Sequence, residues 1–227
     1  MANLSPVEEK RFPDQTAFAA ALAGFIARRL HEGLSERGQA SLVLSGGRTP
    51  RLVLPRLAAL PLPWDKITVT LSDERWVPLD HPDSNEGMIR EYLPAAAHVI
   101  GLYTGHATPE EGEEECEHRL ANFPWPTDVF FLGMGEDGHT ASLFPGFSVP
   151  PGKGRCLAIA PRNGAAQPRM TLTPQALLEG RATSLAISGK SKWPIYEAAL
   201  QPGPIEDLPI RLCLQQERMP IMAFLCP

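Results

Sequence analysis

Residues 128–139 read Asp-Val-Phe-Phe-Leu-Gly-Met-Gly-Glu-Asp-Gly-His, an apolar run that ends in a glycine-rich loop. A continuous apolar run such as 128–132 is typical of a strand in a parallel sheet, which is buried on both faces. Ligands of open parallel sheets bind beyond the carboxyl ends of the strands. The segment therefore indicates an α/β fold, and it makes the loop after the strand a candidate ligand site.

Predicted strands and helices alternate along the chain on both sides of this segment. Short β-prone or apolar runs predict further strands at 40–44, 67–71, 156–160, 170–173, 184–187 and 220–225. Capping residues followed by suitably spaced apolar positions predict helices from Asp14 through Leu30, Thr49 through Leu60, Ser84 to Leu93 and Thr108 through Leu120. This alternation is typical of an α/β fold with a largely parallel sheet and helices on both faces.

The chain of 227 residues is long enough for one large domain or two small ones. No internal repeat or long linker divides the sequence, so residues 1–227 are expected to form a single domain. The helix expected over 109–120 carries six glutamates, which are interpreted as one solvated face and not as a metal cluster.

Composition and charge narrow the class of function. The 21 Lys and Arg residues against 26 Asp and Glu give a formal net charge of −5, whereas non-specific nucleic-acid binding needs a basic face. The apolar run at 17–27 is too short to cross a membrane, and the acidic residues before it do not fit a secretory signal. We therefore expect a cytoplasmic protein that binds neither nucleic acid nor membrane, and the sequence carries no signal of its oligomeric state.

The four cysteines are scattered, and no two of them form a C-x-x-C pair. They are Cys116, Cys156, Cys213 and Cys226. Buried free thiols are expected, with disulfides or a metal site as the alternative.

The first candidate loop, Ser45-Gly46-Gly47-Arg48-Thr49, follows the strand expected at 40–44. Its glycines allow backbone N–H groups to approach an anion, and the helix expected after Thr49 directs its positive end there. The hydroxyls and Arg48 add donors, so the loop is a candidate phosphate cradle, although it lacks the P-loop pattern. A tight strand-to-helix turn without a ligand is the alternative.

The second candidate loop, Ser72-Asp73-Glu74-Arg75, follows the strand expected at 67–71. Three consecutive charges cannot be buried unpaired, so they are expected to face solvent or a polar pocket. The polar residues 81–85 extend this cluster. An ordinary salt-bridged turn is the alternative.

The third candidate loop contains Gly133-x-Gly135-x-x-Gly138, which matches the dinucleotide fingerprint. That fingerprint needs a long helix and an acidic residue about 20 positions later. Here Pro145 stops any helix early and the next acidic residue is Glu179, so nicotinamide binding is not expected. What remains is His139 at an expected helix start, two residues after Asp137. A carboxylate that accepts from one ring nitrogen leaves the other as a proton acceptor, which favours a catalytic histidine over a structural one.

Residues 132–145, Leu-Gly-Met-Gly-Glu-Asp-Gly-His-Thr-Ala-Ser-Leu-Phe-Pro, resemble the longest signature of the 6-phosphogluconolactonases. These enzymes belong to a wider superfamily that includes glucosamine-6-phosphate deaminases. Further blocks resemble the family in the same order and spacing, at 45–50, 72–78 with 83–85, 169–173 and 189–192. Five ordered blocks spanning nearly the whole chain are far more specific than any one of them.

The resemblance implies a Rossmann-like fold and no metal or organic cofactor. It also implies hydrolysis of 6-phosphoglucono-1,5-lactone to 6-phosphogluconate, the second step of the oxidative pentose phosphate pathway. The expected partner is therefore a small sugar-phosphate lactone, whose hydrolysis needs a phosphate anchor, a base for water and a group that stabilises the oxyanion.

The roles implied for individual residues follow from these needs. His139 is expected to take a proton from water, Asp137 to orient or assist it, and Arg75 to stabilise the developing negative charge or to hold the lactone. The residues expected to bind the phosphate and the rest of the substrate are Ser45, Gly46, Gly47, Arg48, Thr49, Asp73, Arg169 and Lys192. Lys190 is an alternative to Lys192.

The sequence departs from the family pattern at two places, and two other functions are alternatives. Many relatives have serine where Arg48 stands, so Arg48 either adds a phosphate contact or points outward. The end of the chain, 224–227, is less aromatic than expected. A glucosamine-6-phosphate deaminase would need an acid soon after Asp73-Glu74 and another just beyond the histidine block, and neither is present. A non-catalytic sugar-phosphate-binding regulator is the other alternative, but no basic helix-turn-helix segment appears.

Overall fold

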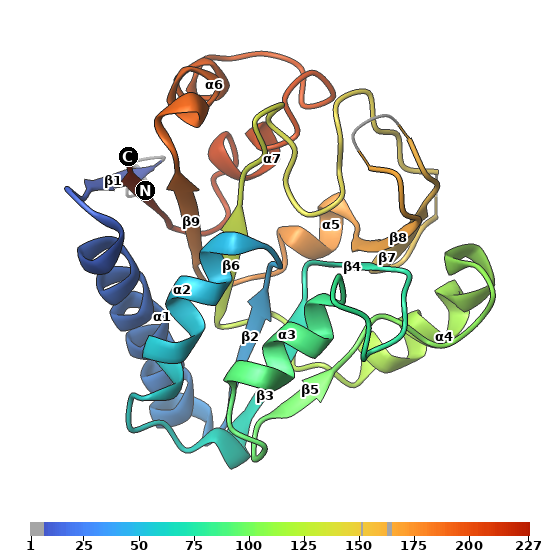
Figure 1. Ribbon diagram of the computed structural model, residues 1–227, viewed down its shortest axis with the longest axis horizontal. Helices are drawn as coiled ribbons and strands as arrows, with labels where there is room; N and C mark the ends of the chain where they lie inside the picture. Colours follow the sequence, from blue (N-terminus) through green and yellow to red (C-terminus); the bar gives the residue numbers. More distant parts are fainter. Residues whose placement is uncertain (1–6, 151, 163–164) are drawn as a thin grey trace.

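A parallel sheet of seven strands forms the centre of the computed structural model, which describes residues 7–150, 152–162 and 165–227 (Figure 1). The strand order is β1-β10-β9-β6-β2-β3-β5, and every neighbouring pair is parallel. The strands are β1 (Glu8–Arg11), β2 (Ala40–Leu44), β3 (Ile67–Leu71), β5 (His98–Ile100), β6 (Val129–Gly133), β9 (Thr183–Ser188) and β10 (Ile221–Cys226). The predicted parallel sheet is confirmed, and β2 and β3 have the predicted bounds.

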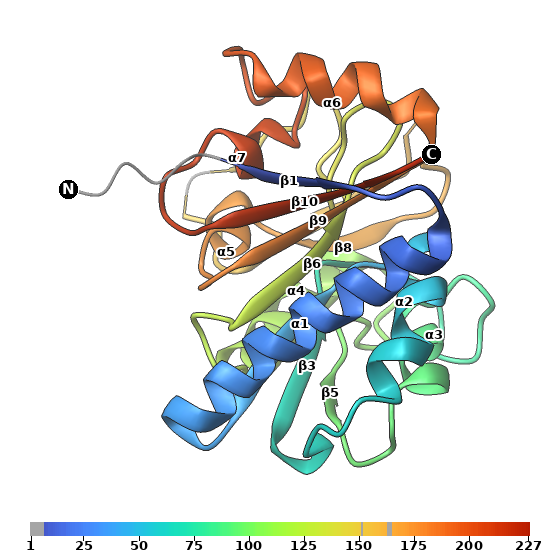
Figure 2. The ribbon, with the colours of Figure 1, turned by 90° about the vertical axis from the view of Figure 1, so that its left-hand side faces the viewer.

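Helices cover both faces of this sheet. The helices are α1 (Gln15–Arg37), α2 (Arg48–Ala58), α3 (Asn85–Tyr92), α4 (Pro109–Ala121), α5 (Pro174–Leu177), α6 (Trp193–Leu200) and α7 (Arg211–Leu214), with 3-10 turns η1 (Trp64–Lys66) and η2 (Lys190–Lys192). Both views place α1 and α2 on one face, with α4 and α5 on the other (Figures 1 and 2). None of the helices in the described residues is long and apolar enough to span a membrane.

The predicted helix starts are confirmed at three positions and wrong at one. Asp14 accepts a hydrogen bond from the Ala17 N–H at 2.8 Å, and Ser84 and Thr108 cap α3 and α4 in the same way. Thr49 does not cap α2. That helix begins at Arg48, because Gly47 takes a φ of 102° that favours glycine and turns the chain into the helix earlier.

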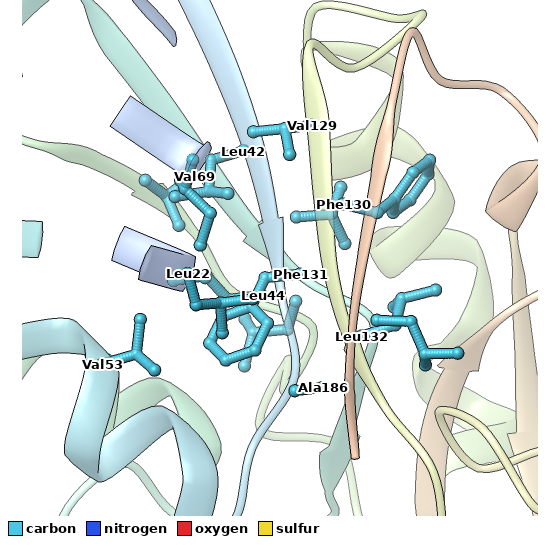
Figure 3. Packing of buried hydrophobic residues seen from close by; sticks show 14 of the residues in the cluster. Leu22, Leu42, Leu44, Val53, Val69, Val129, Phe130, Phe131, Leu132 and Ala186 are labelled. Carbon is cyan, nitrogen blue, oxygen red and sulfur yellow. The ribbon is translucent and has the colours of Figure 1, made fainter. Parts of the chain in front are cut away.

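The core is built from the apolar strands and the inner face of α1. The side chains of Phe130, Phe131 and Leu132 in β6 are fully buried, and in Figure 3 Phe131 lies near Leu44 of β2 and Leu22 of α1. Phe18, Leu22, Ile26 and Leu30 of α1, four residues apart, are also fully buried. This spacing places one helix face against the sheet, as the sequence pattern predicts. The four cysteines are free and buried, as expected.

A second, antiparallel sheet lies beside the first, which the alternation of elements does not predict. Within the described residues its order is β4-β8-β7, with β4 (Asp73–Arg75), β7 (Cys156–Ile159) and β8 (Arg169–Leu172). The strands predicted near 156–160 and 170–173 thus exist but do not join the parallel sheet. The loop expected at 73–75 is a short strand of this small sheet.

The glutamates of α4 do not form one solvated face, contrary to the prediction. The Glu117 carboxylate accepts hydrogen bonds from the backbone N–H of Arg155 (2.8 Å) and of Cys156 (3.1 Å). Glu113 accepts from the Ala158 N–H at 2.7 Å and pairs with Lys153. These two side chains satisfy the backbone donors of β7, so α4 anchors the small sheet through its acidic residues.

The two ends of the described chain meet in the parallel sheet. Strand β1 pairs with β10 from Glu8–Met222 to Arg11–Leu225. Because this pairing joins the N-terminal segment to the last strand, we infer that the described residues form a single domain. The sequence pattern missed β1 because all four of its residues are charged and exposed, which is typical of a protected edge strand.

Candidate active site

A cavity of about 790 Å³ lies at the carboxyl ends of β2, β3, β6, β9 and β10. Ten of the eleven site residues predicted from the sequence line it, and all three candidate loops contribute to its wall. The exception is Asp137, which reaches the cavity through its contact with His139. The arrangement agrees with the rule that ligands of parallel sheets bind at this edge.

The His139 ring and the Asp137 carboxylate form a close pair at this wall. Nδ1 of His139 lies 2.5 Å from Oδ1 of Asp137, and the His139 backbone N–H donates to the same oxygen at 3.1 Å. Burial alone would raise the pKa of Asp137, but these contacts with His139 lower it below its usual value. An ionised carboxylate only accepts, so the proton of a neutral ring lies on Nδ1 and Nε2 remains the acceptor.

His139 does not start a helix, contrary to the prediction. The chain turns at Gly138 and Ala141, whose φ angles of 81° and 50° lie in the left-handed region. The Thr140 hydroxyl donates back to the Gly133 carbonyl at 3.0 Å. The loop therefore folds on itself and holds the His139 ring against Phe144, with ring centroids 4.8 Å apart.

Gly135 leaves the space that the His139 ring fills. A Cβ atom at this position would overlap Nδ1 and Cε1 of His139. We expect Gly135→Ala to displace the ring and to lower kcat by about 10²-fold with little change in KM, since small misplacements of a reacting group cost this much. Steady-state kinetics measure the effect. The matched control is Gly24→Ala on α1, where a Cβ meets no atom within 4 Å; equal kcat values for the two variants would contradict the prediction.

Two arginines stand opposite each other in the small sheet. Arg75 of β4 pairs with Arg169 of β8, so both side chains lie on the same face, and both line the cavity. Burial lowers the pKa of Arg169; nearby Asp73 opposes this shift and Arg75 adds to it. Like charges directly opposite are unfavourable. A bound anion would relieve their repulsion.

Arg169 also shares a buried hydrogen-bond network with Asp73. Its Nη1 lies 3.3 Å from the Ser142 hydroxyl and 3.5 Å from Oδ2 of Asp73. The Ser142 hydroxyl donates to Asp73 at 2.6 Å, and the Ser72 hydroxyl donates at 3.1 Å. Asp73 is therefore buried and hydrogen-bonded while still lining the cavity, so Asp73 and Arg75 face a polar pocket as predicted, whereas Glu74 does not.

Lys192, and not Lys190, lines the cavity. Nζ of Lys192 donates to the Met134 carbonyl at 2.5 Å, whereas Lys190 is exposed and lies outside the cavity wall. Burial lowers the pKa of Lys192, with Glu136 opposing and Arg48 adding to the shift. The lining residues thus include four basic side chains, Arg48, Arg75, Arg169 and Lys192, but one carboxylate, Asp73. An acidic protein presents a cationic cavity.

Asn85 is a cavity residue that the sequence did not single out for the site. Its Nδ2 donates to the Asp73 carbonyl at 2.9 Å, and its Oδ1 accepts from the Arg75 guanidinium. A Cβ on Gly46 would overlap the Asn85 side chain, so Gly46 gives the amide the space it needs. The sequence did carry a signal for Asn85: it follows the helix cap Ser84 directly, and it belongs to the second block that resembles the family (residues 72–78 with 83–85).

Glu74 lies fully buried behind the cavity wall. Its carboxylate accepts from the backbone N–H groups of Arg75 (2.7 Å), Asn85 (2.8 Å) and Glu86 (2.7 Å). Burial, together with a smaller effect of nearby Asp73, raises the pKa of Glu74 to about 7, although these backbone hydrogen bonds act to lower it.

This raised pKa makes the stability contributed by Glu74 depend on pH. The folded protein binds the Glu74 proton more tightly than the unfolded chain, whose carboxyl has a pKa of 4.5. The contribution is therefore complete below pH 4.5 and is lost as pH rises through about 7. We expect the free energy of unfolding of the wild type, relative to Glu74→Gln, to fall between those values. Denaturant titrations of both proteins at each pH measure it, and a difference that does not vary with pH would contradict it.

In the described part of the chain, no group of three or more His, Cys, Asp or Glu side chains is arranged to hold a metal ion.

The fold and cavity define an α/β protein with a cavity lined by basic side chains at the carboxyl edge of a parallel sheet. Residues 13–221 match the family described as glucosamine-6-phosphate isomerases/6-phosphogluconolactonase, and the chain belongs to this family. A 6-phosphogluconolactonase from Pseudomonas aeruginosa is 45% identical over 218 residues, covering 91% of this chain and 86% of the relative. One from Mesorhizobium japonicum is 38% identical over 225 residues, covering 95% and 94%.

A solved structure shows the same fold over nearly the full length. The crystal structure of a 6-phosphogluconolactonase from Shewanella baltica superposes with a TM-score of 0.93 at 35% sequence identity, covering 99% of both chains. The predicted Rossmann-like α/β fold and the resemblance to the family are thereby confirmed.

Proposed function

We propose that this protein hydrolyses 6-phosphoglucono-1,5-lactone to 6-phosphogluconate, the reaction that gives its relatives their name. The observation that carries the proposal is the hydrogen-bonded pair of His139 and Asp137 on the wall of a cationic cavity. A phosphorylated lactone needs both features, because its phosphate requires positive charge and its ester carbon requires an activated water.

His139 is the base in this mechanism. Its Nε2 takes a proton from water as the water oxygen attacks C1, which gives a tetrahedral intermediate with a negatively charged oxygen. The bond from C1 to the ring oxygen then breaks, and His139 returns the proton to that oxygen. Asp137 holds the ring in the required tautomer and stabilises its positive charge between the two steps.

The cationic side chains bind the phosphate and stabilise the oxyanion. Arg169 and Lys192 hold the phosphate together with the backbone and hydroxyls of residues 45–49, whose glycines leave room for an anion at the start of α2. Arg75 stabilises the oxyanion, because its guanidinium is held at the cavity by Asn85 and by the Asp83 carbonyl at 3.2 Å.

The cavity lacks the carboxylates that a deaminase reaction would need. Arg75 stands directly after Glu74, and residues 142–145 are Ser-Leu-Phe-Pro. The Glu74 carboxylate itself faces the N-terminus of α3, away from the cavity. These positions favour hydrolysis over isomerisation within the same family.

A coupled assay tests the proposed function. Glucose-6-phosphate dehydrogenase generates the lactone, 6-phosphogluconate dehydrogenase reports the acid, and a blank without the protein gives the spontaneous rate. Acceleration over the blank is the expected result. Thermal stabilisation by 6-phosphogluconate without acceleration would instead indicate a binding protein, and the absence of both effects would overturn the assigned ligand.

A further inference from the structure

Glu74 connects the start of α3 to the cavity without lining the cavity itself. Its two carboxylate oxygens accept backbone N–H hydrogen bonds from both sides of the segment 76–84: from Arg75 on β4, and from Asn85 and Glu86 at the start of α3. The Ser84 hydroxyl lies 3.3 Å from Oε2. A buried carboxylate is tolerated only when its oxygens are bonded in this way.

The contacts continue from Glu74 to the Arg75 guanidinium. Glu74 fixes the backbone of Asn85, and the Asn85 amide then bridges the Asp73 carbonyl and the guanidinium of Arg75. Arg75 needs this support, because Arg169 stands directly opposite and repels it. Without the bridge, the repulsion would turn the Arg75 side chain away from the position it holds at the cavity.

Capping of α3 accounts for part of the arrangement around Glu74. The Ser84 hydroxyl accepts from the Gly87 N–H at 3.0 Å, and Glu74 accepts from the two backbone donors that precede it in the helix. The third donor, the Arg75 N–H, lies on β4, outside this helix. Glu74 therefore also holds the backbone of the two residues whose side chains meet at the cavity, Arg75 and Asn85.

We propose that Glu74 is a positioning residue for catalysis, which orients the Arg75 guanidinium toward the reacting carbonyl through the start of α3 and the Asn85 amide. The inference rests on the proposed function, in which Arg75 stabilises the oxyanion. Glu74 touches neither substrate nor water in this scheme and acts only through Arg75.

A double-mutant cycle on the full-length protein tests the inference. Glu74→Gln keeps the size of the side chain but turns an amide N–H₂ group toward backbone donors. We expect it to lower kcat/KM by about 10²-fold in the wild-type background, as misplacement of a reacting group does. In an Arg75→Ala background the same change should have little further effect, because the group it positions is gone.

Ser84→Ala is the matched control, since it weakens the same helix start but leaves the backbone contacts of Glu74. It should lower the melting temperature and leave kcat/KM near the wild-type value. If Glu74→Gln does not fold, Glu74→Asp replaces it in the double-mutant cycle, because it keeps the charge but has a shorter side chain.

Three results would overturn the inference. The first is a double variant whose loss of kcat/KM equals the product of the losses in the two single variants. The others are a loss of kcat/KM in Ser84→Ala as large as that in Glu74→Gln, and failure of both Glu74 variants to fold. The wild-type protein distinguishes failure of this inference from failure of the proposed function. If the wild type does not accelerate lactone hydrolysis, the proposed function is wrong. The double-mutant cycle is then measured with the Kd for 6-phosphogluconate in place of kcat/KM.

Discussion

Replacing His139 with alanine is expected to lower kcat by about 10²–10⁴-fold, the range for loss of a general base or acid, with KM nearly unchanged. The ring is the proton acceptor in the mechanism, whereas the anion is bound by other side chains of the cavity. The coupled assay measures both constants once the spontaneous rate is subtracted.

The control for this variant is His31→Ala, which removes an exposed imidazole from α1, outside the cavity wall. It should retain the wild-type kcat. An unchanged kcat in His139→Ala would end the assignment of this residue as the base. A large rise in KM at constant kcat would move His139 from catalysis to binding.

Five of the seven strands of the parallel sheet in the described residues were predictable, because each of the five is a short apolar run with a clear end; β1 and β5 were not predicted. Residues 40–44 and 67–71 are buried along nearly their whole length, so hydrophobicity alone marks their bounds. Which strands pair with one another could not be predicted from the sequence. Nothing local distinguishes 156–159 or 169–172 from strands of the main sheet, because a strand pattern carries no information about its partner.

Charged segments account for the other differences. Strand β1 consists of charged residues, and its strand conformation comes from hydrogen bonds to β10 that no local pattern encodes. The inward-facing glutamates of α4 are a similar case. Glu113 and Glu117 look like parts of a solvated helix face until β7 supplies the backbone donors that they accept from.

For the site, the sequence could predict which segments gather but not how their side chains are held. Loops after parallel strands meet at one edge, so Ser45, Asp73 and His139 were expected to lie near one another, and all three line the cavity. The pairing of Arg75 with Arg169 depends on the unexpected small sheet. Asn85 and Glu74 depend on how α3 docks against β4, which also lies beyond any local pattern.

The small sheet and the main sheet contribute different chemistry to the cavity. The carboxyl edge of the parallel sheet supplies the glycine loop, the His139 loop and Lys192, which are positioned by buried strands. The small sheet supplies Arg75 and Arg169, two like charges that its register forces together. An anion bound between these two guanidiniums would reduce their repulsion, and this reduction would favour binding of an anionic substrate.

Arg169→Ala should therefore mainly raise KM, by about 10–10²-fold, because a hydrogen bond between charged groups contributes about 1.5–3 kcal/mol. The kcat value should change little, since the anchor acts equally on the ground state and the transition state. The variant should still fold, because Asp73 keeps its bonds from Ser72 and Ser142.

The chain offers a matched control in Arg162. Both guanidiniums stack on the Phe144 ring, at 5.6 Å for Arg169 and 5.4 Å for Arg162, but only Arg169 lines the cavity. Arg162→Ala removes the same interaction with the aromatic ring and should leave KM near the wild-type value. Equal increases in KM would assign the effect to packing around Phe144. A fall in kcat at constant KM would contradict the anchor role and would place Arg169, with Arg75, at the developing oxyanion.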